Sequence, residues 1–302
     1  NNQPDSIAGI MYPGYYLNED RAERIVALLE PKNDWTKQDV AKMIYDVTSI
    51  NAPIIIADFV KSINKEDLSA SEKQAISFLK NWKGNFDKEE IGPVIYNRVV
   101  YEFQKNTFSD EMGKAYNQFV NTPFIEKVLP VQAKRKNSIW WDNISTKDKI
   151  ETKEDIINTS FKNAFAFLQK QLGENVENWK WERVISVEYK HAVGEVAILR
   201  KFFNVGPFVT NGGDQVINNQ IYDIDSTGVY KVKAGPSTRR IIDFSDVENS
   251  LAILPTGQSG NVFSEHYKDQ SQKYLNGEFE KMKLNTSEIE KSKNILILKP
   301  KQ

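Results

Sequence analysis

The chain has 302 residues, in which 40 lysine and arginine residues nearly balance 41 aspartate and glutamate residues. This balance gives no general electrostatic reason to bind nucleic acid or an anionic membrane, and the short basic run 134–136 indicates only a solvated loop. The absence of cysteine excludes thiol catalysis, disulfides and cysteine-ligated metal sites, and two histidines far apart, His191 and His266, do not form a His-rich zinc motif.

Neither a membrane span nor a targeting signal is evident in the sequence. No run of about 18 apolar residues occurs. The first residues, Asn-Asn-Gln-Pro-Asp, lack the basic head and apolar centre of a signal peptide. Because the chain also does not start with methionine, we expect a mature or truncated portion of something longer.

The first part of the chain is predicted to be an extended segment followed by helices. Proline and glycine recur over residues 1–18, which indicates an extended, turn-broken segment. Apolar residues at helical spacing predict a helix over Asp20–Glu30, ended by the following proline. Thr36 followed by Asp39 predicts the start of a second helix.

Further helices are predicted up to residue 172. The context after Pro53 favours a helix, and Ser71 is expected to open another. Residues 89–129 are predicted to be mostly helical, with an aromatic stripe more typical of a core than of a ligand platform. Thr152 or Asp155 is expected to begin a strong helix that stops at a glycine.

After Trp181 the pattern becomes β-rich. Arg239–Phe244 and Ser250–Leu254 flank turn-forming residues and predict an antiparallel strand pair. Other short strands are predicted at Val184–Tyr189, Ile221–Ile224, Val229–Val232 and Asn294–Leu298, with a helix over residues 286–293. Runs of helices followed by runs of strands indicate an α+β fold rather than alternating α/β. The chain is thus divided into an extended sheet segment (1–18), a mainly helical lobe (19–180) and a β-rich return to the sheet (181–302).

Several motifs together resemble the C-terminal part of the β chain of the penicillin acylase (penicillin amidase) family, which are N-terminal-nucleophile (Ntn) amidohydrolases. The strongest is the run Leu254-Pro255-Thr256-Gly257-Gln258-Ser259-Gly260-Asn261. Further matches follow the same order along residues 1 to about 280, nearly the whole chain. They are Asn1-Asn2-Gln3-Pro4, Asp20–Ile25, Trp140–Asp142, Asn178–Trp181, Phe203–Phe208, Gly212–Asp214, Gly235–Ser237 with Arg239, and His266-Tyr267.

The resemblance implies a fold and a chemistry. The fold would be part of a four-layer α/β/β/α Ntn-hydrolase, with a large helical insertion between N-terminal and C-terminal sheet strands. The family's nucleophile uses its own α-amino group as base, which suits a group titrating near ~7.7–8.0. The first Asn of the Asn-Asn motif, here Asn1, would serve the oxyanion hole. Arg21 matches the arginine that holds this Asn in place, and Arg24 is the competing assignment.

The resemblance also implies what this chain does not supply. The nucleophile would lie upstream and not in this chain, so the fragment alone is expected to be inactive. No cofactor is required for the chemistry. The resemblance also allows a structural Ca²⁺ in the full-length protein, whose ligands in this chain are unknown. The expected partners are an N-acyl substrate of β-lactam or acyl-homoserine-lactone type, and the α chain and N-terminal part of the β chain of the same precursor, in the periplasm or outside the cell.

Other interpretations remain open at this stage. Asn1 could be a turn or strand-end residue, and Arg21 could pair with Glu19 or Asp20 on a helix surface. A buried, hydrogen-bonded structural role is favoured for His266, and a plain turn is favoured over an anion cradle for 211–214. At the level of function, the alternatives are a non-catalytic binding or scaffold protein that retains the acylase fold, and an unrelated α+β domain.

Overall fold

The described part of the computed structural model consists of residues 9–10, 20–120, 122, 124–293 and 295–300. Its contacts divide the chain into two compact units. Unit 1 contains the described parts of Asn1–Pro31, Asp46–Val187 and Phe208–Gly235. Unit 2 contains the described parts of Lys32–Tyr45, Glu188–Pro207 and Pro236–Gln302.

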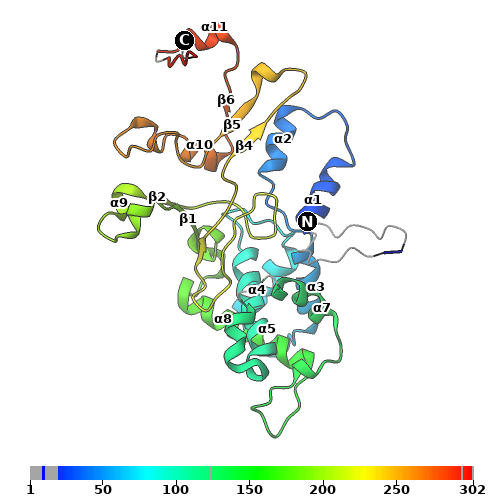
Figure 1. Ribbon diagram of the computed structural model, residues 1–302. Helices are drawn as coiled ribbons and strands as arrows, with labels where there is room; N and C mark the ends of the chain where they lie inside the picture. The colour runs from blue at the N-terminus through cyan, green and yellow to red at the C-terminus, as the bar shows by residue number, and fades with distance from the viewer. Residues whose placement is uncertain (1–8, 11–19, 121, 123, 294, 301–302) are drawn as a thin grey trace. The chain divides into compact units, whose positions relative to one another are not determined.

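Unit 1 is largely helical and unit 2 holds shorter elements (Figure 1). The helices of unit 1 are α1 (Asp20–Leu29), α3 (Asn51–Ser62), α4 (Ala70–Asn81), α5 (Gly92–Met112), α6 (Tyr116–Val120), α7 (Phe124–Lys134) and α8 (Lys153–Leu172). The helices of unit 2 are α2 (Lys37–Ile44), α9 (Arg200–Phe203), α10 (Ser271–Asn276) and α11 (Thr286–Ile289). None of the helices in the described ranges is long and apolar enough to cross a lipid bilayer.

Capping boxes explain where three of the helices begin. Thr36 caps α2 with Asp39, and Thr152 caps α8 with Asp155, as the sequence predicted. The predicted start of α4 at Ser71 is wrong by two residues. Ser69 is the cap, because its hydroxyl accepts the amide of Glu72 while the Glu72 carboxylate accepts the amide of Ser69.

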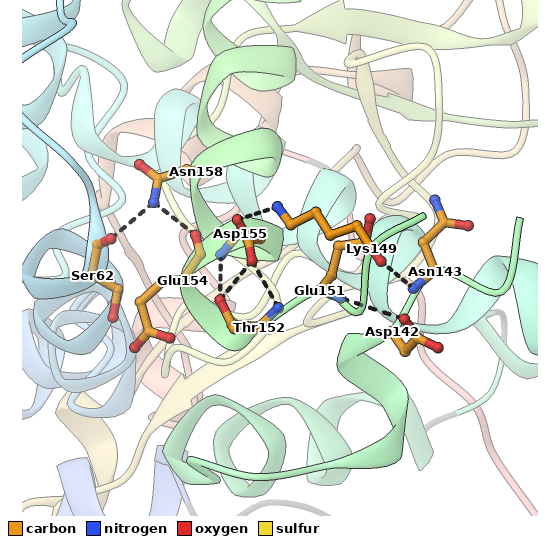
Figure 2. A network of polar contacts seen from close by, with 9 residues as sticks. All are labelled: Ser62, Asp142, Asn143, Lys149, Glu151, Thr152, Glu154, Asp155 and Asn158. Atoms are coloured by element: carbon orange, nitrogen blue, oxygen red, sulfur yellow. Dashed lines mark hydrogen bonds and ion pairs between the residues drawn. The ribbon is translucent and has the colours of Figure 1, made fainter. Parts of the chain in front are cut away.

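The segment before α8 is held by further polar contacts, which Figure 2 shows. The amide of Asn143 donates to Glu151 at 2.9 Å, and Lys149 pairs with Asp155 at 2.6 Å. One turn into the helix, Asn158 donates to the carbonyl of Ser62 at 3.0 Å, which fastens the start of α8 to the end of α3.

The core of unit 1 lies between α5 and α8, which pack along each other. Phe103 of α5 and Phe161 of α8 are almost fully buried, and the Phe103 ring lies 4.7 Å from that of Phe59 on α3. Arg98 of α5 forms a buried ion pair with Glu102 and stacks over Phe167 of α8 at 3.4 Å. A long buried helix with this much apolar contact does not need a sharply amphipathic pattern.

A cluster of aromatic rings surrounds Trp181 at one side of this core. The Trp181 side chain is fully buried, and its ring lies 5.8 Å from Phe86, 5.7 Å from Tyr222 and 5.0 Å from Tyr230. Its indole N–H donates to the carbonyl of Gly212 at 3.0 Å, so the polar end of the ring is satisfied. The cluster therefore holds residues 212–230 against the helices.

Two small three-stranded sheets complete the fold. The first has the order β2-β1-β3, with β1 (Ile185–Tyr189), β2 (Val205–Phe208) and β3 (Tyr230–Val232), and β1 pairs in parallel with β3. The second has the order β4-β5-β6, with β4 (Arg239–Ile241), β5 (Leu251–Ile253) and β6 (Glu280–Lys281), all antiparallel. The predicted pairing of the strands around residues 239 and 251 is confirmed, although both strands are shorter than predicted.

Two predicted strands are wrong, and the predicted 286–293 helix is reduced to α11. Within Ile221–Ile224, only Ile221 forms an isolated bridge, to Ala234, because the Tyr222 ring is drawn into the Trp181 cluster. Residues 295–298 form no strand, and their side chains are exposed. A β-prone run still needs a ladder partner, and these residues have none among the described ranges.

Unit 2 is organised around the buried guanidinium of Arg239 in β4. Its carbon lies 3.9 Å from the Tyr45 ring centre and 4.0 Å from the Tyr274 ring centre, and one nitrogen donates to the Tyr274 carbonyl. The Tyr45 hydroxyl donates to the same carbonyl at 2.6 Å. Arg239 therefore connects β4 with the end of α2 and with α10.

The run 254–261 forms a loop docked on residues 266–270, also in unit 2. The amide of Leu254 donates to the side chain of Gln270, and the amide of Ser259 donates to the carbonyl of His266 at 3.0 Å. A Cβ at Gly257 would lie only 2.0 Å from that same carbonyl, so this position admits no larger residue. Gly260 has open space around it.

Replacing Arg239 should destabilise unit 2 strongly. Arg239→Met should lower the free energy of unfolding by about 2 kcal/mol, because stacking on two rings and a buried hydrogen bond are lost together. Arg240→Met is the matched control, since Arg240 is the exposed neighbour on the same strand. Urea denaturation measures both variants, and equal effects of the two would contradict this role for Arg239.

Gly257→Ala should lower the free energy of unfolding by about 1–3 kcal/mol, because the new methyl group collides with backbone that is itself hydrogen bonded. Gly260→Ala in the same loop should be close to neutral. Thermal melting of both variants tests the distinction, and a Gly257→Ala protein as stable as the parent would show that the close approach is wrong.

Candidate functional site

Unit 1 contains a cavity of about 730 Å³. Its wall is formed by the start of α1, the start of α3, one face of α5, α7 with the residues before it, and the segment 214–224. A volume of this size is typical of a small-molecule site. The cavity is therefore the candidate functional site of the described part of the chain.

Much of the cavity wall is aliphatic. The side chains of this kind come from the four helices α3, α5, α6 and α7 and from the 221–224 segment; they are Ala52, Ile55, Val100, Val120, Ile125, Leu129, Val131, Ile221 and Ile224. Such a lining favours a hydrocarbon group, whose transfer from water gains about 25 cal/mol for each Å² buried.

Charged groups of α1 form another part of the wall. Asp20, Arg21 and Glu23 all line the cavity. The Asp20 carboxylate is buried and accepts the Ser49 hydroxyl at 2.8 Å and the Ile50 amide at 3.0 Å. Burial raises the pKa of Asp20, and these hydrogen bonds oppose the rise. Asp20 therefore fixes the first turn of α1 against the start of α3.

The two candidate arginines of α1 have different surroundings. Arg21 lines the cavity, and none of the carboxylates in the described ranges forms an ion pair with it. Arg24 does not line the cavity. Its guanidinium makes two hydrogen bonds to Asp46, at 3.0 and 2.6 Å, and so ties α1 to the segment before α3. The alternative pairing of Arg21 with Asp20 is not seen, because the Asp20 carboxylate is turned to Ser49 and Ile50.

The aromatic part of the wall comes from the Trp181 cluster. Phe86, Tyr96 and Tyr222 of this region line the cavity. Burial raises the pKa of Tyr96 and of Tyr222, so both phenols keep their protons at neutral pH. The Tyr222 hydroxyl accepts a hydrogen bond from the Asn97 amide at 3.1 Å, which ties the 214–224 segment to α5.

Asn1, the expected oxyanion residue, lies outside the described residues. The glycines at 212 and 213 are used for packing. The amide of Gly212 donates to the carbonyl of Phe86 at 2.9 Å, and a Cβ at Gly213 would lie 2.7 Å from the Phe86 ring. This segment is a turn whose Gly212 amide is already engaged, so it cannot serve as a free anion cradle.

The expectation that His266 is buried is wrong. Its side chain is 64% exposed, and Nδ1 lies 2.9 Å from Asp269. This hydrogen bond raises the pKa of His266. The imidazole is exposed, whereas the backbone carbonyl of His266 accepts the amide of Ser259 and so helps to hold the 254–261 loop. The sequence correctly predicted a hydrogen-bonded histidine and misjudged its burial, because burial depends on contacts outside the motif.

Sequence reasoning missed the polar residues that α5 contributes to the cavity. These residues are Asn97 and Gln104. They lie on one face of the helix, with Val100 between them, and all three line the cavity. The spacing was a usable signal, but the aromatic stripe of the same region drew attention to the core. In the described ranges, no group of three or more histidine or carboxylate side chains is placed to hold a metal ion.

Comparison with known proteins agrees with this architecture. The sequence profile of the penicillin amidase family matches residues 1–291. An acyl-homoserine lactone acylase QuiP from Pseudomonas aeruginosa is 24% identical over 92% of this chain, and the QuiP of Pseudomonas syringae pv. tomato is 26% identical over 90%. The alignments cover 36% and 35% of those relatives, so the chain spans about a third of their length.

A likeness in three dimensions supports the fold. A thermostable penicillin G acylase from Alcaligenes faecalis matches with a TM-score of 0.57 and 15% identity, covering 100% of this chain and 56% of that one. With the helices and small sheets described above, this confirms the predicted α+β class and the Ntn-hydrolase fold. The profile match extends over nearly the whole sequence, and we conclude that the chain belongs to the penicillin amidase family.

Proposed function

We propose that this chain is part of an amidohydrolase that cleaves the amide bond of N-acyl compounds. The observation that carries the proposal is the position of Arg21 in the wall of a cavity that is lined by aliphatic side chains as well as by polar and charged ones. A cation beside an apolar pocket suits a substrate with a polar reacting group attached to a hydrocarbon chain.

In this proposal the nucleophile comes from the rest of the protein, and this chain supplies the residues that stabilise the oxyanion. A hydroxyl or thiol nucleophile, supplied from upstream of this chain, attacks the amide carbon while its own α-amino group takes the proton. The tetrahedral intermediate carries a negative oxygen. The carboxamide of Asn1 donates a hydrogen bond to that oxygen, and Arg21 supports Asn1 in this position. The leaving amine then takes the proton back, and water releases the acyl group.

The substrate class follows from the lining of the cavity and from the names of the relatives. Those relatives are named acyl-homoserine lactone acylases, and the solved neighbour is named a penicillin G acylase. We favour N-acyl homoserine lactones, because an aliphatic wall suits a flexible acyl chain. Their cleavage would quench quorum signalling, whereas a β-lactam substrate would connect the protein with antibiotics.

The remaining features of the proposal concern the full-length protein. Its α chain and the N-terminal part of its β chain would complete the site and the sheet. We place it in the periplasm or outside the cell. A structural Ca²⁺ would bind in the longer protein, through oxygen ligands.

Arg21→Ala in the full-length, processed protein should lower kcat for an N-acyl homoserine lactone by about a hundredfold, with a smaller change in KM. The loss falls on kcat because the cation matters most when the oxyanion forms. Arg24→Ala is the matched control. It should reduce stability by removing the pair with Asp46, while kcat per folded molecule stays close to that of the parent. A larger kcat loss for Arg24→Ala would reverse the assignment.

Asn1→Ala should lower kcat by about 100- to 1,000-fold, because one preorganised oxyanion donor is removed. Asn2→Ala, at the next position of the same motif, is the control and should retain most activity. Release of homoserine lactone is measured for both variants. Equal effects of the two substitutions would refute the oxyanion role of Asn1. If the processed parent cleaves no N-acyl amide, the alternative of a non-catalytic binding protein with the acylase fold is favoured.

A further inference from the structure

The loop between β1 and β2 in unit 2 exposes several large apolar side chains. It contains a short 3₁₀ helix, η5 (Ala192–Glu195), and α9 (Arg200–Phe203), which pack against each other. The exposed apolar residues of this loop, here called the 192–203 patch, are Val193, Val196, Ile198 and Phe202. A single exposed apolar residue is ordinary, but four on one short loop are typical of an interaction surface.

The base of the loop is held by contacts that leave the patch outside. The amide of His191 donates to the side-chain oxygen of Asn204 at 3.1 Å, and the His191 ring lies 5.2 Å from the ring of Phe203. The hydroxyl of Tyr267 donates to the carbonyl of Phe203. A Cβ at Gly194 would lie 1.8 Å from the Asn204 side chain, so the inner side of the loop is closely packed. Because the loop is already ordered, docking on it costs little conformational entropy.

The charges near the patch make an anionic membrane a poor partner. Within residues 188–203, three basic side chains stand against two carboxylates, and Arg200 is paired with Glu188 at 2.9 Å. Stable attachment to a membrane surface needs a stronger basic cluster or a second anchor. A second copy of the chain is also a poor partner, because a stable interface takes about 800 Å² from each side, more than four side chains on one loop expose.

A partner within the same molecule needs much less surface. Its segments are tethered to this chain during folding, which gives them a high effective concentration. Such polypeptide exists in proteins of this kind, since the chain spans only about a third of the length of the relatives that it matches. The 192–203 patch therefore suits polypeptide of the same precursor better than a separate molecule.

We propose that the 192–203 patch is a docking surface for an apolar segment of the same precursor that lies outside this chain. This inference rests on the proposed function, which assigns further polypeptide to the protein. The segment packs against Ile198 and Phe202. It also carries a carboxylate near Lys201, because Lys201 lies over the Phe202 ring at 5.1 Å and none of the carboxylates in the described ranges forms an ion pair with it.

Hydroxyl-radical footprinting of the full-length, processed protein tests whether the patch is covered. Phe202 is 59% exposed in this chain. In the folded full-length protein its oxidation should be about tenfold slower than in the same protein unfolded in urea, because a packed interface excludes water. Ile150, which is 80% exposed and lies outside the patch, is the reference and should be oxidised at a similar rate in both states. Equally fast oxidation of Phe202 in both states would overturn the inference.

A substitution tests whether the contact stabilises the protein. Ile198→Asp should lower the melting temperature of the full-length, processed protein by about 3 °C or more, because it places a carboxylate against apolar surface. Ile150→Asp is the matched control and should melt like the parent, since its side chain stays in water. If Ile198→Asp does not accumulate, Ile198→Ala should shift melting in the same direction by a smaller amount. Equal melting of the variants at 198 and 150 contradicts the contact.

Cross-linking at Lys201 identifies the covering polypeptide. A lysine-reactive reagent is added to an equal mixture of isotope-labelled and unlabelled full-length protein. Cross-links from Lys201 to lysines outside this chain, within molecules of one label, support the inference. Cross-links between labelled and unlabelled molecules would show a second copy, and protection of Phe202 only with vesicles of anionic phospholipid would show a membrane; either result overturns it. These measurements need no substrate, so the inference can hold even if no N-acyl amide is cleaved.

Discussion

The burial of Trp181 holds in place two of the aromatic side chains that line the cavity of unit 1. This side chain is fully covered, touches rings that come from distant parts of the sequence, and has its indole N–H satisfied by Gly212. Because the rings pack edge to face and tilted, they fix the path of the backbone from residue 212 to residue 230. Two members of the cluster, Phe86 and Tyr222, expose one side to the cavity. On this side of the cavity the packed rings therefore hold the 214–224 loop in place.

The first turn of α1 places charged side chains in the wall of the cavity. Asp20 is buried, and its two hydrogen bonds compensate only part of the cost of burying a carboxylate, which is why its pKa rises. Arg24 is held by Asp46, so the helix is fixed on both sides of Arg21. The guanidinium of Arg21 can therefore be presented to the cavity at a low cost in side-chain and backbone ordering. Such preorganisation is what the stabilisation of a transient negative charge requires.

Much of the fold could be predicted from residues that are close together in the sequence. The cavity could not, because it is formed by contacts between residues far apart in the chain. The capping boxes at Thr36 and Thr152 place two helices correctly, because capping depends on residues three apart. The strands expected around Ile221 and residue 295 failed, because pairing depends on a partner far away in the chain. The strongest family motif, 254–261, forms a docked loop, so its sequence signal reports tight backbone packing. Gln104 was missed because the aromatic residues of the same region indicated a core, although its helical spacing from Asn97 was a usable signal.

Each of the two units consists of several stretches of sequence that are separated along the chain. The strand β4 depends on Tyr45, and Tyr45 follows a helix inserted between two segments of unit 1. Neither unit can therefore be excised by cutting the gene at a single point. A duplicated or transplanted version of either unit would have to carry several separated segments together.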